Sequence, residues 1–221
     1  MELNDVMRTT FAARDFTDEP VPDAVIRRIL DNARFAPSGG NRQGWKVLVV
    51  RDQKTRAALG PLIRPTMQRY RAQQQAGEAP WNTINPTRLT PEEIARVEPP
   101  QSLIDAICNA PVILLVFVDL SVVASFDSEL DRIGVISGAS VYPFVWNILM
   151  GARNEGLGGT LTTFAAGNEP DVQALLGVPS HVALAAMLPI GKPVKQLTKL
   201  KRKQVDEFAM LERWGGAPLP S

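Results

Sequence analysis

The sequence predicts an α+β protein in which helices cover both faces of a sheet. Its helix-like and strand-like stretches do not alternate in the strict order of parallel α/β folds. Residues 112–118 form a continuous apolar run, which is typical of a strand buried on both faces. The chain has 221 residues, 45% hydrophobic and 21% charged, which is enough for a sizeable core. We therefore expect a single domain over residues 1–221.

The first elements are expected to lead into a loop of small residues. Apolar spacing predicts helices over 3–12 and 23–35, and β-branched residues predict a strand over 46–50. Residues 36–45, Ala-Pro-Ser-Gly-Gly-Asn-Arg-Gln-Gly-Trp, connect the second helix to this strand. Their small side chains allow a flat ligand to approach the backbone, and their polar groups can fix it. An ordinary polar loop is the alternative.

Residues 60–101 are the least regular part of the sequence. They hold seven prolines and a run of three glutamines. Asp52 predicts the N-cap of a helix that runs through Leu59. Beyond it we expect a lid-like insertion at about 60–101, with Met67, Tyr70 and Trp81 shaping a substrate face. A surface excursion without a role in any site is the alternative.

The second half of the chain supplies the remaining core elements. The patterns predict helices over 102–109, 133–152 and 169–176, and a strand over 181–190. The helix over 133–152 is apolar on more than one face, which favours a central position or contact with a second subunit. Pro143 marks a kink or a break in it.

Composition excludes several classes of function. A net charge of +1 gives no reason to expect a nucleic-acid partner, and no apolar run reaches the roughly 20 residues that span a membrane. With one cysteine, Cys108, and one histidine, His181, we expect no disulfide and no metal site. The N-terminus lacks signal-peptide features, which predicts a cytoplasmic protein. If the protein is an enzyme, an organic cofactor is expected to supply the chemistry.

Five stretches, in order, resemble motifs of the FMN-dependent nitroreductase family. Residues 36–45 resemble its Ala-Pro-Ser-x-x-Asn-x-Gln-Pro-Trp loop, with glycine in place of the proline, and residues 14–22 resemble the end of its first motif. Residues 156–158 resemble its flavin-facing turn; 188–193 and 201–203 resemble its last core strand and the basic segment that follows. The resemblance implies a central mixed or antiparallel sheet flanked by helices. It also implies an intertwined homodimer with FMN at the interface, and a C-terminal arm at about 195–221 that reaches the partner.

The resemblance further assigns residues to FMN and requires no catalytic side chain. It implies that Arg14 faces the N1 and C2-carbonyl edge of the flavin, where a cation favours the reduced ring; an ion pair with a nearby carboxylate is the alternative. Arg202 matches the phosphate-binding arginine, with Lys201 beside it; a solvated basic patch is the alternative. Thr10-Phe11-Ala12 replaces the usual Arg-Arg-Ser, and Arg8 is the candidate substitute. The expected cofactor-binding residues are Arg8, Arg14, Ser38, Gly39, Asn41, Leu161, Thr162, Thr163, Lys201 and Arg202.

The implied activity is hydride transfer from NADPH or NADH, through FMN, to a small electron-poor acceptor such as a nitroaromatic or a quinone. Reductive dehalogenation is one alternative, because residues 200–203 resemble the iodotyrosine deiodinase branch. That branch has three threonines where this chain has Leu161-Thr162-Thr163. A flavin-binding or sequestering protein with little turnover is the third interpretation.

Overall fold

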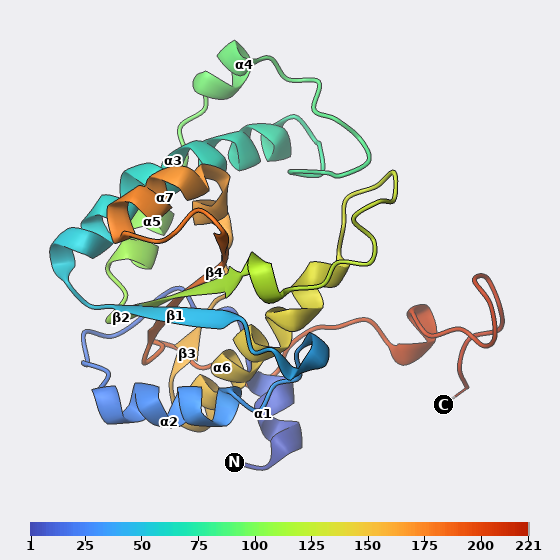
Figure 1. Ribbon diagram of the computed structural model, residues 1–221, viewed down its shortest axis with the longest axis horizontal. Helices are drawn as coiled ribbons and strands as arrows, with labels where there is room; N and C mark the ends of the chain where they lie inside the picture. Colours follow the sequence, from blue (N-terminus) through green and yellow to red (C-terminus); the bar gives the residue numbers. More distant parts are fainter. Residues whose placement is uncertain (221) are drawn as a thin grey trace.

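Four strands form an antiparallel sheet in the computed structural model, which describes residues 1–220 (Figure 1). Across the sheet the order is β1 (Trp45–Val50), β2 (Val112–Asp119), β4 (Val182–Gly191) and β3 (Gly158–Gly159). β1 and β3 are therefore the two edges. The expected sheet is confirmed, and all its pairings are antiparallel.

Helices cover both faces of this sheet. In Figure 1, α3 (Gln53–Gln75), α5 (Gln101–Cys108) and α7 (Glu169–Leu176) lie on one face, and α2 (Asp23–Ala33) and α6 (Tyr142–Asn154) on the other. The shorter helices are α1 (Leu3–Thr9) and α4 (Pro91–Ala95). Single 3₁₀ turns are η1 (Gly39–Asn41), η2 (Leu120–Val122), η3 (Ile136–Ser140), η4 (Phe164–Asn168) and η5 (Val205–Glu207). No helix in the described chain is both long and apolar enough to cross a membrane.

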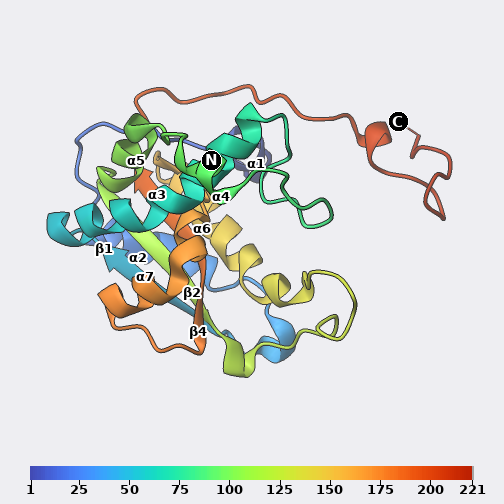
Figure 2. The same cartoon turned by 90° about the horizontal axis from the view of Figure 1, so that it is seen from above.

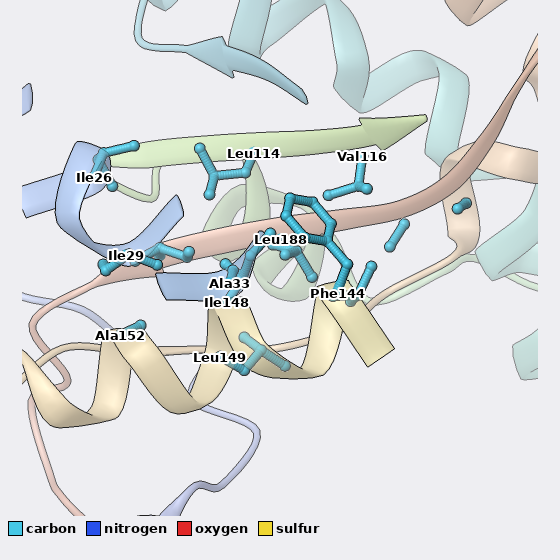
Figure 3. Packing of buried hydrophobic residues seen from close by; sticks show 14 of the residues in the cluster. Ile26, Ile29, Ala33, Leu114, Val116, Phe144, Ile148, Leu149, Ala152 and Leu188 are labelled. Atoms are coloured by element: carbon cyan, nitrogen blue, oxygen red, sulfur yellow. The ribbon is translucent and has the colours of Figure 1, made fainter. Parts of the chain in front are cut away.

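The side chains of β2 alternate between two hydrophobic cores, as the continuous apolar run predicts. Leu114 and Val116 pack with α2 and α6, as Figure 3 shows, whereas Ile113 and Leu115 pack against α3, α5 and α7. All four are 0% exposed. Burial on both faces makes β2 the centre of the fold.

α3 is much longer than the sequence predicts. It continues through Pro61 and Pro65, although each proline removes a backbone donor and costs about 3 kcal/mol inside a helix. Leu59, Ile63 and Met67 are spaced by four residues and are all buried on one face of the helix. Their burial offsets the proline cost, so the irregular segment begins after residue 75 rather than at residue 60.

Pro143 marks a break rather than a kink. η3 ends before it, and Pro143 lies in the first turn of α6, where its missing N–H leaves no hydrogen bond unmade. The helix predicted over 133–152 is therefore two elements. The predicted first helix also ends earlier than expected, at Thr9.

The segment that follows α3 is tied down by hydrogen bonds. The Glu78 carboxylate accepts from Thr87 Oγ1 at 2.6 Å and from the Arg88 N–H at 2.8 Å. These bonds, that from Thr87 first, hold the pKa of Glu78 below its usual value. Gln73 accepts the N–H of Trp81 at 3.1 Å. The segment is thus folded onto α3, and its role as a moving lid stays a prediction.

The C-terminal residues leave the body as an arm (Figures 1 and 2). Gln196 Nε2 donates to the Thr9 carbonyl at 3.1 Å, so the arm departs beside the end of α1. Beyond this point most side chains are exposed, and Trp214 is 94% exposed.

Candidate functional site

A pocket of about 430 Å³ lies between α3, α5 and the segment that joins β3 to η4. α3 contributes Thr66 and Tyr70, and the loop after it contributes Trp81. Residues 160–164 form the opposite wall with their hydroxyl and backbone groups. Arg14 is the one charged side chain among the described residues that line the pocket.

Arg14 lies at this pocket because its segment forms backbone hydrogen bonds at the β3 edge of the sheet. The Ala13 N–H donates to the Gly159 carbonyl at 3.0 Å, and the Thr17 N–H donates to the Lys192 carbonyl at 2.9 Å. Lys192 in turn forms an ion pair with Glu19 at 2.6 Å. Arg14 itself is exposed and forms no ion pair with any described residue. The alternative of a structural ion pair is not observed. Arg14 Nη1 donates to the Ala12 carbonyl at 3.3 Å, and the other guanidinium donors are available to a ligand.

Leu161, Thr162 and Thr163 line the same pocket in a polar arrangement. Thr162 exchanges both backbone hydrogen bonds with Met187 of β4, at 3.0 and 2.8 Å. In such an antiparallel pair the amides of the flanking residues point away from the partner strand. The amides of Leu161 and Thr163 therefore face outward from the sheet edge. This edge offers backbone donors and a hydroxyl beside the Arg14 cation.

The loop that contains Ser38, Gly39 and Asn41 is built separately, at the start of β1. Ser38 Oγ accepts the N–H of Gln43 at 3.0 Å, and Asn41 Oδ1 accepts Gln43 Nε2 at 3.1 Å. The N–H of Gly39 donates to Ser140 Oγ at 3.2 Å. Asn41 adopts a left-handed backbone with φ 53°. Asn41 and Gln43 thus secure the loop, while Ser38 and Gly39 present little side chain to the outside.

These two groups of residues lie at opposite corners of the sheet. The Ser38 loop precedes β1, whereas the Arg14 segment pairs with β3 at the other edge. Trp45 pairs with Val118 at one end of β2, while Ile190, which pairs with Gly159, faces Val112 at the other end. One chain therefore brings Arg14 and residues 161–163 together, and does not bring Ser38, Gly39 and Asn41 to them.

The predicted phosphate-binding cations lie outside the pocket. Arg8 is exposed in the last turn of α1. Arg202 and Lys201 are exposed on the arm, where Arg202 Nη1 donates to the Lys201 carbonyl at 2.8 Å. Six residues of extended chain span on the order of 20 Å, so the arm beyond Gln196 has the length to bring Arg202 back past α1.

The structure corrects the predicted substrate face at one position. Tyr70 and Trp81 line the pocket as expected, but Met67 is 3% exposed and belongs to the core. Thr66, one residue earlier, takes its place in the lining. The signal that sequence analysis missed is the four-residue spacing of Thr66 and Tyr70, which puts both on one face of α3. Phe164 was also missed; its ring meets that of Tyr70 edge-on, with centroids 5.6 Å apart.

The chemistry of these groups suits a flat, electron-accepting, hydrogen-bonding ring. A cation, outward backbone amides and hydroxyls lie on one side, and aromatic side chains lie on the other. No described group of three or more His, Cys, Asp or Glu side chains could hold a metal ion.

Comparisons with known proteins identify the family. The model of the nitroreductase family matches residues 7–192. Iodotyrosine deiodinase 1 of Homo sapiens is 26% identical over 209 residues, which cover 94% of this chain and 67% of the relative. An NADH dehydrogenase of Thermus thermophilus is 27% identical over 211 residues, covering 83% of this chain and 82% of the relative.

A solved structure shares the fold over nearly the whole chain. Oxidised iodotyrosine deiodinase bound to FMN and 3-iodo-L-tyrosine superposes with a TM-score of 0.68 at 24% identity. The match covers 96% of this chain and 100% of that structure's chain. Together with the family match, this places the chain in the nitroreductase family.

Proposed function

We propose that the protein binds FMN and transfers hydride from NADPH or NADH to a nitroaromatic, a quinone or a similar electron-poor acceptor. When bound, FMN supplies the hydride chemistry. With a quinone the balance is quinone plus NAD(P)H plus H⁺, giving hydroquinone plus NAD(P)⁺. The observation that carries the proposal is the pocket lined both by Arg14, which has no ion-pair partner among the described residues, and by Leu161 and Thr163, whose amides face outward.

Each side of the pocket has a separate task in this proposal. Arg14 holds a positive charge beside the ring edge that becomes negative on reduction, which favours the reduced state. The backbone of Leu161 and Thr163 positions the ring by hydrogen bonds. Tyr70 and Trp81 restrict water from the other face and leave room for one flat substrate at a time.

We propose that a second copy of the chain completes the site by supplying Ser38, Gly39 and Asn41. The support is the separation of the two corners and the apolar surface beside the Ser38 loop. Tyr142 and Trp146, spaced by four residues on α6, are exposed, and Phe126 in the preceding loop is 90% exposed. Exposed large apolar side chains on one helix face, such as Tyr142 and Trp146, support an interface between copies of the chain. In the dimer, the arm would bring Arg202 and Lys201 to the cofactor phosphate, with Arg8 as the nearest substitute for the missing first-motif arginine.

The visible spectrum of the purified protein tests this proposal. We expect flavin absorbance after addition of FMN, bleaching by NADPH or NADH without oxygen, and recovery on addition of a quinone. A protein that takes up no FMN would contradict the whole proposal. Bound FMN without turnover would instead support the sequestering alternative.

Reductive dehalogenation is a second candidate, because iodotyrosine deiodinases are found by both sequence and structure. An assay for iodide release from 3-iodotyrosine distinguishes it from quinone reduction. We expect quinone reduction to dominate, since Leu161 has no hydroxyl to offer the flavin where that branch has threonine.

A further inference from the structure

The wall of the pocket that faces a substrate carries no charged side chain. Thr66, Tyr70, Trp81 and Leu103 form it, from α3, the following loop and α5. Arg14 is committed to the cofactor in the proposed function. No aspartate or glutamate appears among the described residues that line the pocket. An ammonium group entering here would lose its water without gaining a carboxylate partner.

The backbone of Trp81 has an unfavourable conformation. Its φ of 52° lies in the left-handed region, which bulky side chains rarely adopt. Such a conformation persists only where the surroundings fix it, and it is concentrated at functional positions. Here the fixing group is the buried Gln73, which accepts the Trp81 N–H at 3.1 Å.

A second cation, Arg69, lies against the Trp81 ring. The Arg69 guanidinium carbon lies 4.1 Å from the centroid of the Trp81 ring. Arg69 forms no ion pair with a described residue, and its Nε is buried without a hydrogen-bond partner. Its charge therefore has no paired carboxylate among the described residues. Arg69 thus places a positive charge behind this wall, which attracts anions and repels cations.

We propose that Trp81 is a specificity-determining residue whose ring stacks on a planar aromatic acceptor, and that the pocket selects neutral or anionic acceptors over those with an ammonium group. This inference rests on the proposed function and narrows its substrate class. It predicts poor turnover of halotyrosines, because the ammonium group of these zwitterions would find no carboxylate partner among the described lining residues.

The test uses the FMN-loaded protein and three nitrobenzenes that differ only in the group on a para methylene: 4-nitrophenylacetate, 4-nitrobenzyl alcohol and 4-nitrobenzylamine. We expect kcat/KM for the amine to be at least about tenfold below that for the alcohol. Calorimetric titration of the oxidised holoprotein, with no reductant present, should give the same order of affinity. Equal or better binding and turnover of the amine would overturn the inference.

Variants then assign the selectivity to the wall. Trp81→Ala should raise KM for all three compounds, while Trp81→Phe should keep most of the affinity because it retains a flat ring. Thr66→Glu should improve kcat/KM for the amine by about tenfold, and its neutral match Thr66→Gln should not. Arg27→Ala removes an exposed cation from α2, on the opposite face of the sheet, and is the control for general charge. Unchanged selectivity in Thr66→Glu, or an unchanged KM in Trp81→Ala, would contradict the assignment to this wall.

Failure of the proposed function is distinguishable from failure of this inference. If no nitro compound and no quinone is reduced, the oxidoreductase proposal fails, whereas the calorimetric order of the three ligands still supports or contradicts the charge selection.

Discussion

The two corners of the sheet that carry the predicted cofactor residues differ in how complete they are. At the Arg14 corner, one chain builds a pocket with an unpaired cation, outward amides and an aromatic wall. At the Ser38 corner, a small-residue loop is mostly exposed, and α6 carries the exposed side chain of Trp146. A folded chain gains nothing from leaving such apolar surface in water. The contrast supports our proposal that the second corner, supplied by another copy, complements the first.

The largest change in stability is expected from a substitution on the buried face of α6, which packs against the sheet. Ile148 is 0% exposed and packs in the core shown in Figure 3. Ile148→Ala should lower the free energy of unfolding by about 2–5 kcal/mol, because it leaves a cavity between α6 and the sheet. Urea denaturation measures this. A loss below about 1 kcal/mol would mean that α6 is not an integral part of the core.

The Arg14 corner is tested by removing its cation. Charge-assisted hydrogen bonds contribute about 1.5–3 kcal/mol, so Arg14→Ala should weaken FMN binding by roughly 10- to 150-fold. Titration followed by flavin fluorescence measures the affinity. Arg27→Ala, which removes an exposed cation from α2, is the matched control. Equal affinity in both variants would remove Arg14 from the site.

The outer face of α6 distinguishes a buried interface from an ordinary surface. Trp146 and Leu175 are each 42% exposed, but they lie on opposite sides of the sheet, on α6 and α7. Trp146→Ala should raise the dimer dissociation constant by about tenfold or more, since aromatic residues dominate interface energies. Leu175→Ala should leave it unchanged. Sedimentation measures both, and the reverse order would place the interface on the α7 side.

The smallest effect concerns the loop that leads to η3. Asp127 accepts the Val135 N–H at 2.7 Å and Arg132 Nη1 at 2.8 Å, and these bonds hold the pKa of Asp127 well below its ordinary value of 3.8. Because the pKa of Asp127 is lower in the folded protein than in the unfolded chain, its contribution to the stability of the fold is complete at a pH above the unfolded-state pKa. It is lost as the pH falls below about 4.

Asp127→Asn should therefore speed amide exchange at Val135 at pH 6. The same variant should also make the loop less sensitive to acid than in the unaltered protein. Unaltered exchange at pH 6 would show that the Asp127 carboxylate does not hold this loop.

Much of the fold could be predicted because the core residues follow local patterns of apolar spacing. The apolar run of β2 and the helix over 169–176 match the structure in type and position. The sequence predicts a shorter helix than α3 because prolines usually end helices. The spacing of Leu59, Ile63 and Met67 was visible in the sequence, and their burial in the tertiary structure outweighed the local signal.

The site was less predictable, for a physical reason. Arg14 and residues 161–163 could be named from motif resemblance, and the pairing at β3 brings them together. The position of Trp81 depends on one hydrogen bond from its backbone N–H to the side chain of Gln73, and such a contact has no periodic signature in the sequence. The separation of the Ser38 loop follows from strand order, which local patterns do not specify.

Subunit complementation tests the central claim most directly. Arg14→Ala removes the cation from one corner, and Gly39→Val places a branched side chain over the backbone of the other. The valine should not disturb its own chain, because a Cβ at Gly39 meets only Ser140 Oγ there, at an ordinary 3.4 Å. Each variant alone should bind FMN poorly. When the two are unfolded and refolded together, half of the dimers are mixed and each has one intact site, so about a quarter of the sites should recover FMN. Recovery of no sites, or normal binding by Gly39→Val alone, would contradict a site shared between two chains.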